Sequence, residues 1–488
     1  MKKKLFIVIA ALALVAVLCG TLAACNDTVT DDMFRGGLLI AIDTDGNIGA
    51  VNSKGETVIP FSYSMILPFC GEYSYASYDR GDSYGLFLID KEGNRAEGPE
   101  AMLDAKNGDE PSYTEGYMAL RDKNTELWGI MDMNAAKWSV SPVYDKAAIY
   151  GNIAVTEMGG VTAVVKCDGT AVASGDDAVA GEDYILLFDS ESEQMKSSVK
   201  VISAADGSIS AEVADIDIVG AYGGSEAPGY TVRFVDGGGV ETTATRFAGS
   251  DYTVTSTGDT GEWVEQVWNN LVLTAGENAE GEAVYTIRDI HGKSVLEGVT
   301  GAAYVAQTIS RADGIDEKIV YAETLDGSGE TVAHYIDAVT ATEIVLPADT
   351  AFGDIELFRD SETEALYGFV QGRVYSLVTD DGNGAHSSST EVLVENADIL
   401  EVQGISAGRY LIYGDVRGRH MADLQTSEDI ASAGLKGAVL YYPGYAVVIN
   451  ASGQTQGNLS TRLTMYKFGE SGLESMFEID DIAGFYLL

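Results

Sequence analysis

The stretch Trp128-Gly129-Ile130-Met131-Asp132-Met133-Asn134 decides the fold, because it recurs earlier in the chain in two weaker forms. The earlier copies begin at Tyr84-Gly85 and at Ile48-Gly49, so the three glycines are spaced by 36 and 44 residues. Each copy reads as a strand, a glycine- or Asx-containing turn and a second strand. Self-similarity at a period of about 20 to 50 residues is typical of repeat architectures. We therefore expect a chain built from repeated β units.

A proline and a tyrosine mark the second half of the unit. Val58-Ile59-Pro60 precedes Tyr63 in the first copy, and Ser141-Pro142 precedes Tyr144-Asp145 in the third. Together these motifs resemble the WG-repeat family, also called KWG repeats, whose unit joins an aromatic-glycine dipeptide to a proline bend and a tyrosine. The resemblance covers residues 36 to about 172. It implies a β-rich array used for binding, and it implies no catalytic residues.

The same rhythm continues in looser form after this region. Alternating apolar residues flank Asp168-Gly169, Asp206-Gly207, Asp236-Gly237, His291-Gly292 and, further along, Ser452-Gly453. Asp-Gly and similar pairs between such runs predict hairpins, because these turns need a positive φ. Helical periodicity is nearly absent from the chain after the leader. We therefore predict an all-β protein.

Many short strands in units of about 40 to 50 residues predict a β-propeller with four-stranded blades. Dividing the 464 residues that follow the leader by this unit gives roughly nine to eleven blades. We reduce this number to about seven or eight to allow for a tether and long loops. An open β-solenoid is the alternative. We expect one domain over residues 36–488, with WG-like repeats over 36–175 and degenerate β-repeats over 176–488; a division near residue 175 is the fallback.

The first 24 residues predict export. Lys2-Lys3-Lys4 precede an uncharged apolar run from Leu5 to Leu18, which is shorter than the roughly 20 residues that a membrane-spanning helix needs. Leu22-Ala23-Ala24-Cys25 resembles the lipobox of bacterial lipoproteins, which implies cleavage before Cys25 and a lipid on that cysteine. Residues 25–35 would then hold the lipid and a polar tether on the extracytoplasmic face of a bacterial membrane. A secretory signal with a chance cysteine is the alternative.

The chain is strongly acidic, with 75 Asp and Glu against 30 Lys and Arg and a net charge of −45. Loss of the leader, which holds three of the lysines and no acid, makes the net charge −48. Such a charge repels polyanions, so we expect no nucleic-acid partner. Cations and basic proteins remain candidates. A hydrophobic content of 46% is well above that of disordered chains and permits a large core.

No catalytic constellation stands out in the sequence. The four histidines lack zinc-ligand spacing, and neither a G-x-S-x-G elbow nor a phosphate-binding loop occurs. A serine contact to His386 is one alternative, and paired glycosidase carboxylates among the 75 acids are another. Asp-rich turns such as Asp43-Thr44-Asp45-Gly46-Asn47 lack the full calcium-loop spacing, and turn formation accounts for them. We expect a non-enzymatic protein with no metal and no cofactor.

Two cysteines remain once Cys19 leaves with the leader and Cys25 carries the lipid. Cys70 and Cys167 lie 97 residues apart in repeats that are not neighbours. A disulfide between them is compatible with export. Two buried free thiols are the alternative.

Trp138, Trp263 and Trp268 are the candidate ligand contacts. Tyrosine and tryptophan on a rigid scaffold offer a large contact area with a polar tip. Trp128 belongs to the repeat motif and is expected in the core. Trp263 and Trp268 are five residues apart, so on a regular strand they point to opposite faces. Packing between blades is the alternative fate of both.

These features predict a monomeric, membrane-anchored lipoprotein that acts as a protein-interaction or ligand-binding scaffold. An exported carbohydrate-binding or carbohydrate-active propeller, using acidic and aromatic residues, is the alternative. A third hypothesis is an accessory subunit of an envelope assembly. Its acidic surface would select a basic partner and hold it best at low salt.

Overall fold

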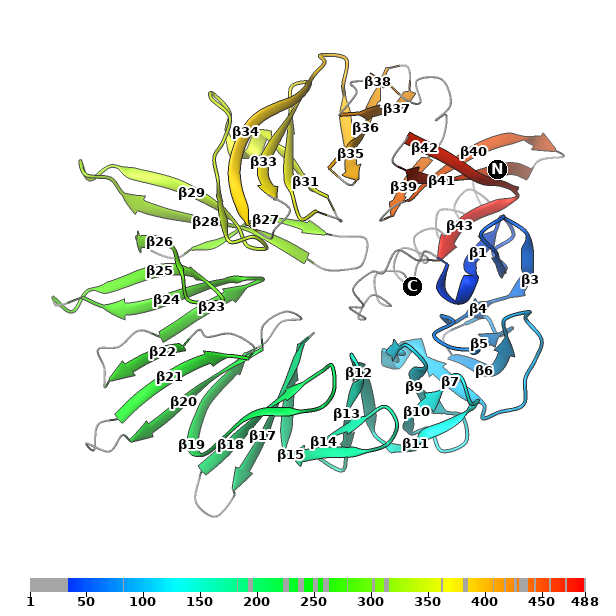
Figure 1. Ribbon diagram of the computed structural model, residues 1–488, viewed down its shortest axis with the longest axis horizontal. Coiled ribbons are helices and arrows are strands. Elements are labelled where there is room, and N and C mark those ends of the chain that lie inside the picture. Colours follow the sequence, from blue (N-terminus) through cyan, green and yellow to red (C-terminus); the bar gives the residue numbers. More distant parts are fainter. Residues whose placement is uncertain are drawn as a thin grey trace.

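The computed structural model is a ring of antiparallel β-sheets in which the chain runs once around the centre (Figure 1). Helical turns in the described residues are limited to three short 3₁₀ segments, η1 (Arg35–Gly37), η2 (Ala105–Asn107) and η4 (Phe352–Asp354). The all-β propeller prediction is confirmed. The structure describes residues 34–486 except 82, 182, 192–195, 223–227, 236–240, 249–252, 258–262, 279, 301–302, 311–315, 361–362, 381–384, 407, 417, 425–427, 430–437, 443–444, 456–457 and 470–471.

Each blade consists of four strands, which we name A to D from the centre of the ring outward. In blade four, β12 lies nearest the centre and β15 lies at the periphery (Figure 1). Neighbouring strands pair antiparallel throughout, as at Ile153↔Lys166 between β13 and β14. Side chains alternate along each strand, so every blade presents apolar residues to both of its neighbours.

The strands of blades one to six are, from A to D, as follows. Blade one contains β43 (Ile482–Tyr486), β1 (Leu39–Asp43), β2 (Ile48–Val51) and β3 (Thr57–Tyr63); blade two contains β4 (Met65–Ile66), β5 (Tyr73–Ser77), β6 (Ser83–Asp90) and β7 (Ala101–Asp104). Blade three contains β8 (Tyr113–Thr114), β9 (Tyr117–Asp122), β10 (Trp128–Asp132) and β11 (Lys137–Tyr144); blade four contains β12 (Lys146–Tyr150), β13 (Ile153–Met158), β14 (Val161–Lys166) and β15 (Ala171–Gly175). Blade five contains β16 (Asp177–Ala180), β17 (Tyr184–Glu191), β18 (Lys196–Ser203) and the first part of β19 (Ile209–Tyr222); blade six contains the second part of β19, β20 (Gly229–Val235), β21 (Glu241–Phe247) and β22 (Thr253–Thr257).

Blades seven to eleven follow the same order. Blade seven contains β23 (Trp263–Trp268), β24 (Leu271–Glu277), β25 (Ala283–Asp289) and β26 (Ser294–Val299); blade eight contains β27 (Tyr304–Ser310), β28 (Asp316–Leu325), β29 (Thr331–Asp337) and β30 (Thr342–Ile344). Blade nine contains β31 (Glu356–Arg359), β32 (Leu366–Val370), β33 (Arg373–Asp380) and β34 (His386–Glu395); blade ten contains β35 (Glu401–Ser406), β36 (Tyr410–Asp415), β37 (Gly418–Asp423) and β38 (Glu428–Asp429). Blade eleven contains β39 (Ala438–Tyr442), β40 (Tyr445–Thr455), β41 (Asn458–Gly469) and β42 (Gly472–Asp480).

The described strands therefore make eleven blades, and the expected seven or eight is too low. Hydrogen bonds join them into eight sheets, because three sheets of seven or eight strands each contain two blades. Strand β19 shows how two blades merge: it pairs with β18 as far as Ile216 and with β20 from Asp217 onward. The number of blades need not have been reduced to allow for long loops, because many strands are joined by short turns, such as the turn between Trp268 and Leu271.

The ring is closed by strands from both ends of the chain. β43 pairs with β1 in the registers Ala41↔Phe485 and Ile40↔Tyr486. The side chains of Phe34, Leu39 and Phe485 share one buried cluster with residues of blade eleven. Closure pairs the edge of β1 and leaves the short strand β43 as the inner edge of blade one. The open-solenoid alternative is wrong.

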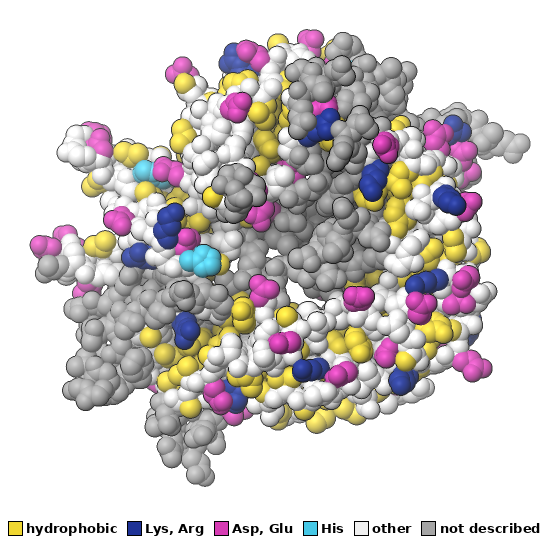
Figure 2. All heavy atoms as spheres, viewed as in Figure 1, with side chains coloured by type: hydrophobic (Ala, Val, Ile, Leu, Met, Phe, Trp, Pro, Cys, Tyr) yellow, Lys and Arg dark blue, Asp and Glu magenta, His cyan; other side chains and the backbone are white. Residues whose placement is uncertain are grey.

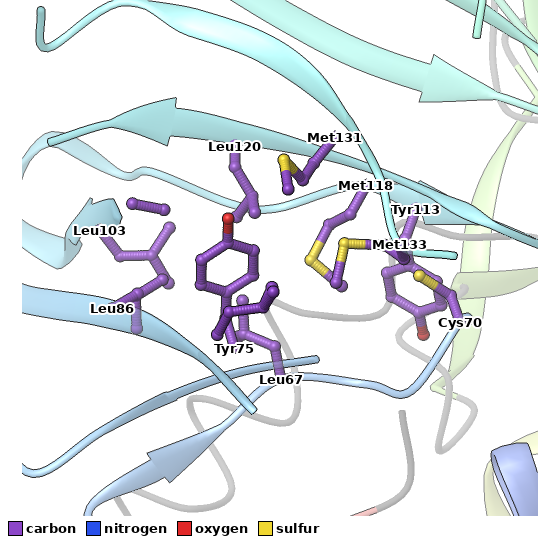
Figure 3. Close-up of a cluster of buried hydrophobic side chains, with 12 residues drawn as sticks. Leu67, Cys70, Tyr75, Leu86, Leu103, Tyr113, Met118, Leu120, Met131 and Met133 are labelled. Carbon is purple, nitrogen blue, oxygen red and sulfur yellow. The ribbon is translucent and has the colours of Figure 1, made fainter. Parts of the chain in front are cut away.

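In the part of the chain that the structure describes, buried apolar side chains form eleven clusters, one between each pair of neighbouring blades. Figure 3 shows the cluster between blades two and three, where Tyr75 and Leu86 face Met118 and Leu120. The cluster between blades four and five spans residue 175. Each blade thus depends on two interfaces, and the core is distributed around the ring.

The aromatic-glycine motif marks the start of strand C in the first three blades. A Cβ on Gly49 would lie 2.6 Å from the carbonyl oxygen of Ile59, and one on Gly129 would lie 2.7 Å from that of Val140. Both carbonyls belong to the adjoining strand D, so no larger residue fits. Trp128 packs in the cluster between blades three and four, and its expected core role is confirmed.

Several hairpins share one turn in which an Asp or Asn organises the backbone. In the first, Asp43 Oδ1 accepts the N–H groups of Asp45 at 2.9 Å and Asn47 at 2.8 Å, and the Gly46 N–H donates to the Asp43 carbonyl. Gly46 has a φ of 81°, in the left-handed region. The same pattern recurs in the turns that begin at Asn52, Asp90, Asn278, Asp289 and Asp326.

The positive φ expected at the hairpin glycines is confirmed at Gly169, Gly207 and Gly292. Ser452-Gly453 differs, because it lies inside β40 at an irregularity of the ladder and forms no turn. A glycine within a strand commonly marks such a bulge. Asp236-Gly237 lies outside the described residues.

Candidate functional site at one end of the blades

Antiparallel pairing gives every blade two chemically different ends. The A–B and C–D turns lie at one end, which we call the A–B end. The B–C turns and the connections from one blade to the next lie at the other end, which we call the B–C end. The hairpins β24–β25 and β28–β29 carry their B–C turns outward from the ring at the left of Figure 1.

Hydrogen bonds between neighbouring blades concentrate at the A–B end. Asn152, in the A–B turn of blade four, donates its backbone N–H to Ala204 O and its side-chain amide to Ala205 O of blade five, both at 2.9 Å. Asn270 of blade seven does the same toward Ala338 O at 2.9 Å and Val339 O at 2.7 Å in blade eight. The A–B end therefore holds neighbouring blades of the ring together.

A buried charged cluster reinforces the A–B end between blades eight and nine. Arg359 donates from Nη2 to Asp337 Oδ1 at 2.6 Å, and its Nε contacts the carboxylate of Glu317. All three side chains are almost fully buried. Charges without water around them must be paired, so the guanidinium holds two carboxylates in place.

Exposed apolar side chains concentrate at the B–C end. Val416 is 84% exposed and Tyr78 60% exposed, both beside B–C turns. Among the large exposed apolar residues of the described chain, only Ile209 lies at the A–B end, and Val392 lies within an outermost strand. The others at or next to the B–C end are Val143, Met158, Val161, Val284, Tyr304, Leu325, Val332, Val345 and Leu400. The B–C end thus carries most of the large exposed apolar side chains of the described chain.

Acidic side chains lie at the same end of the blades as these apolar groups. Figure 2 shows Asp and Glu spread along the periphery of the ring with apolar side chains between them. Several of the bases at this end are already neutralised, as in the ion pairs Lys123–Glu100 at 2.8 Å and Arg373–Glu395 at 2.6 Å. Exposed acids at the B–C end include Asp79, Glu126, Asp177, Glu282, Asp326 and Asp398.

Blade two carries an aromatic stack at this end. The ring of Tyr78 lies 4.9 Å from that of Tyr63 and 5.2 Å from that of Phe87. The Arg95 guanidinium sits 4.8 Å from the Phe87 ring centre and pairs with Glu100 at 2.7 Å. Burial and the hydrogen bond with Tyr78 raise the pKa of Tyr63 to about 12, so its phenol stays neutral.

The predicted tryptophan contacts have different fates. Trp268 is 2% exposed and packs in the cluster between blades seven and eight, so it is wrong as a ligand contact and matches the packing alternative. Trp138 is half-buried against the cluster between blades two and three. The side chain of Trp263 and the whole of Cys25 lie outside the described residues. An irregularity between Val264 and Gln266 interrupts β23, so the strict alternation assumed for the tryptophan pair does not hold.

His386 makes no catalytic contact with a serine in the described chain. Its Nε2 lies 3.5 Å from Glu364 Oε2. Ser387 instead pairs with the Thr379 hydroxyl at 3.0 Å, and Ser388 donates to the Glu343 carbonyl. The described residues also contain no group of three or more His, Cys, Asp or Glu placed to hold a metal ion.

Cys70 and Cys167 are both buried, and no disulfide joins them. They lie in different clusters, Cys70 between blades two and three and Cys167 between blades three and four. Burial and the nearby Asp168 raise the pKa of the Cys167 thiol to about 12. The disulfide alternative is therefore wrong, and both cysteines are buried thiols.

Comparisons with known proteins identify no family. No family model matches the chain, and no curated protein matches it. Solved structures give distant likenesses: a eukaryotic initiation factor shares 12% identity over 73% of this chain and 96% of its own, with a TM-score of 0.30. The β-propeller domain of the Trilobed protease from Pyrococcus furiosus shares 8% identity over 74% of this chain and 92% of its own, with a TM-score of 0.23. The fold assignment rests on the strand topology, and the WG-repeat resemblance stays a prediction.

No helix within the described residues has the length and apolar character needed to cross a membrane.

Proposed function

We propose that this protein is a non-enzymatic binding scaffold, anchored by a lipid on Cys25 outside the cytoplasmic membrane, whose B–C end holds a partner protein with a basic surface. The observation that carries the proposal is the concentration of exposed apolar side chains at that end, as with Val416 and Tyr78. Contact residues of this kind supply the desolvated centre of an interface.

Charge supports a basic partner. The mature chain has a net charge of −48 once its three leader lysines are gone, and exposed acids such as Asp79 and Asp398 lie at the B–C end. Complementary charge speeds association and suppresses wrong partners, while apolar contact supplies affinity. A rigid closed ring suits this role, because its turns are held in place and little is lost in ordering them on binding.

The binding surface is tested by placing a photo-crosslinking phenylalanine analogue at Val416 and, as a matched control, at Ile209 of the A–B end, in the intact lipoprotein expressed in cells. We expect adducts with a protein of high isoelectric point from position 416 and none from position 209. Equal adducts from both positions, or adducts with acidic proteins only, would contradict the proposal.

The anchor is tested separately with Cys25→Ser. We expect the unsubstituted protein in the membrane fraction with an acyl chain on Cys25. The variant should lose the acyl chain and leave that fraction, or retain its uncleaved leader, because the peptidase of this pathway acts next to a lipidated cysteine. An unchanged variant that is still cleaved and membrane-bound would rule the anchor out.

A further inference from the structure

A row of tyrosines crosses three strands of blade eight and begins with Tyr304 at the B–C end. Tyr304 of β27 lies directly opposite Tyr321 of β28, which lies opposite Tyr335 of β29. The ring centres are 5.0 Å and 5.4 Å apart, with interplanar angles of 39° and 59°. Phe352, in the connection to blade nine, stacks on Tyr335 at 4.0 Å and 6°. Cross-strand aromatic pairs of this kind stabilise one another and hold the row rigid.

One end of the row of tyrosines is packed against the core, and the other end is exposed to solvent. Tyr335 and Phe352 pack against the buried cluster between blades eight and nine. Tyr304 is 55% exposed, and the nearby Leu325 is equally exposed at the end of β28. A ligand can therefore reach the ring of Tyr304 while the tyrosines behind it stay fixed.

A carboxylate adjoins the row of tyrosines. Glu323 lies two residues after Tyr321 on the same face of β28 and accepts the Tyr321 hydroxyl. Among the described residues, Glu323 forms no ion pair with a lysine or arginine. A carboxylate has two oxygens, so it can accept a further donor. Because that hydrogen bond raises the pKa of Tyr321 to about 12, the ring stays neutral at physiological pH.

The aromatic stack of blade two shows that a cationic side chain can bind beside aromatic rings and a glutamate. There a guanidinium of the same chain, that of Arg95, lies over Phe87 and pairs with Glu100. Blade eight offers the same two components, stacked aromatic rings and a glutamate, and no described lysine or arginine pairs with that glutamate. A cation is attracted by the faces of aromatic rings and by the carboxylate together.

We propose that Tyr304, Tyr321 and Glu323 form the specific recognition site of the B–C end, and that they bind an arginine or lysine side chain of the basic partner. This inference rests on the proposed function, since it names the residues by which that partner would be held. The site selects by charge and by aromatic contact, whereas the rest of the acidic surface selects by charge alone.

The test uses the purified mature lipoprotein in detergent and a fluorescent peptide that carries three arginines between leucines. A second peptide of the same sequence with neutral citrulline in place of arginine is the control probe. Binding is measured by anisotropy at about 0.15 M salt, where long-range attraction to the acidic surface is largely screened. We expect the arginine peptide to bind and the citrulline peptide to bind at least about tenfold more weakly.

The variants locate the site. Tyr304→Ala and Glu323→Gln should each weaken binding of the arginine peptide by about three- to tenfold, and Tyr304→Phe, which keeps the ring, should not. Ile209→Ala removes an exposed apolar side chain from the A–B end and should leave binding unchanged. Thermal unfolding of each variant verifies that the ring stays folded.

The possible failures are distinguishable. Binding of the arginine peptide that is unaffected by Tyr304→Ala and Glu323→Gln would overturn this site while the scaffold function stands. Absence of binding to the unsubstituted protein would overturn the basic partner as well. Preferential binding of a neutral oligosaccharide such as cellohexaose, lost in Tyr304→Ala, would replace the cationic ligand with a glycan and overturn the inference.

Discussion

At the scale of single residues, Arg359 holds the most consequential position in the described chain. Its guanidinium is the shared partner of two buried carboxylates, Asp337 and Glu317, that come from another blade. Isolated charges in a protein interior are costly, and removal of one partner leaves the others unpaired. The cluster therefore couples the fold of blade eight to that of blade nine.

Arg359→Ala should lower the free energy of unfolding by about 3–5 kcal/mol, because it removes the positive charge that Arg359 places between two buried carboxylates. The matched control is Arg373→Ala, which breaks the exposed pair with Glu395 and should cost about 1 kcal/mol or less. Urea denaturation of both variants measures the difference. Similar losses of unfolding free energy in the two variants would show that the buried cluster contributes no more to stability than an exposed ion pair.

Cys70 and Cys167 should be unreactive in the native protein. Both are buried, and the raised pKa of Cys167 leaves very little thiolate at neutral pH. A coloured thiol reagent should therefore label neither residue until guanidinium unfolds the chain, after which both react. Labelling without a reductant checks the pairing too, since a disulfide would give no thiols even after unfolding.

Alkaline pH should destabilise the fold. Burial raises the pKa of Tyr63 and Tyr367 to about 12, and the bond to Glu323 does the same for Tyr321. Because the unfolded value is about 10, the folded state holds these protons more tightly. Their stabilising contribution is complete below about pH 10 and is lost as the pH rises toward 12. Urea midpoints at increasing pH, with tyrosinate absorbance as a second probe, should fall across this window; a flat profile would contradict it.

At the scale of single elements, the recurrent turn combines side-chain and backbone requirements. The first residue accepts backbone N–H groups, and the fourth is a glycine with a positive φ. The first and fifth residues also complement each other: Asn47 donates to Asp43, and Asn52 donates to Glu56. In the first turn the carboxylate is at position one and the amide at position five, and in the second turn these positions are exchanged. This explains why Asp and Asn exchange at the first position without loss of the turn.

A comparison of Gly46 with Gly55 separates two reasons for a glycine in this turn, namely its positive φ and the lack of space for a side chain. Both have a positive φ, but a Cβ on Gly46 meets nothing within 4 Å, whereas one on Gly55 lies 2.8 Å from the ring of Phe477 in blade eleven. Gly46→Ala should cost about 1–2 kcal/mol of stability through backbone strain alone. Gly55→Ala should cost a further 1–3 kcal/mol or so, because Phe477 must move. Equal losses in urea denaturation would show that the ring closure tolerates displacement of Phe477.

At the scale of the whole molecule, stability depends on closure of the ring. The last strand, β43, supplies the innermost strand of blade one and contributes Ile482 and Phe485 to the cluster shared with blade eleven. Without it, the edge of β1 would be unpaired and that cluster incomplete.

Truncation after Asp481 should open the ring locally. Amide hydrogen exchange in β1 should become fast while exchange in blades four and five stays slow, because each blade depends mainly on its two neighbours. Truncation after Tyr486 is the control and should leave exchange unchanged. Uniformly fast exchange throughout the truncated chain would instead show that the ring folds as one cooperative unit.

The sequence by itself determined the class of fold, since repeated strands, positive-φ glycines and the near absence of helical periodicity are local properties of the chain. It also determined the core role of Trp128, because the repeat places this residue at the start of a strand. The sequence-based estimate of the number of blades was too low because blades share strands such as β19 and have short connections, which only the pairing reveals.

Only the tertiary structure decided where ligand contacts lie. Trp268 was a candidate ligand contact with packing between blades as the alternative, and it is buried because blade eight covers it. Tyr304, Tyr321 and Tyr335 are scattered in sequence and come together because the registers of three strands place them opposite one another. Burial depends on the neighbouring blade and cross-strand contact depends on register, so neither could be derived from local patterns of residues.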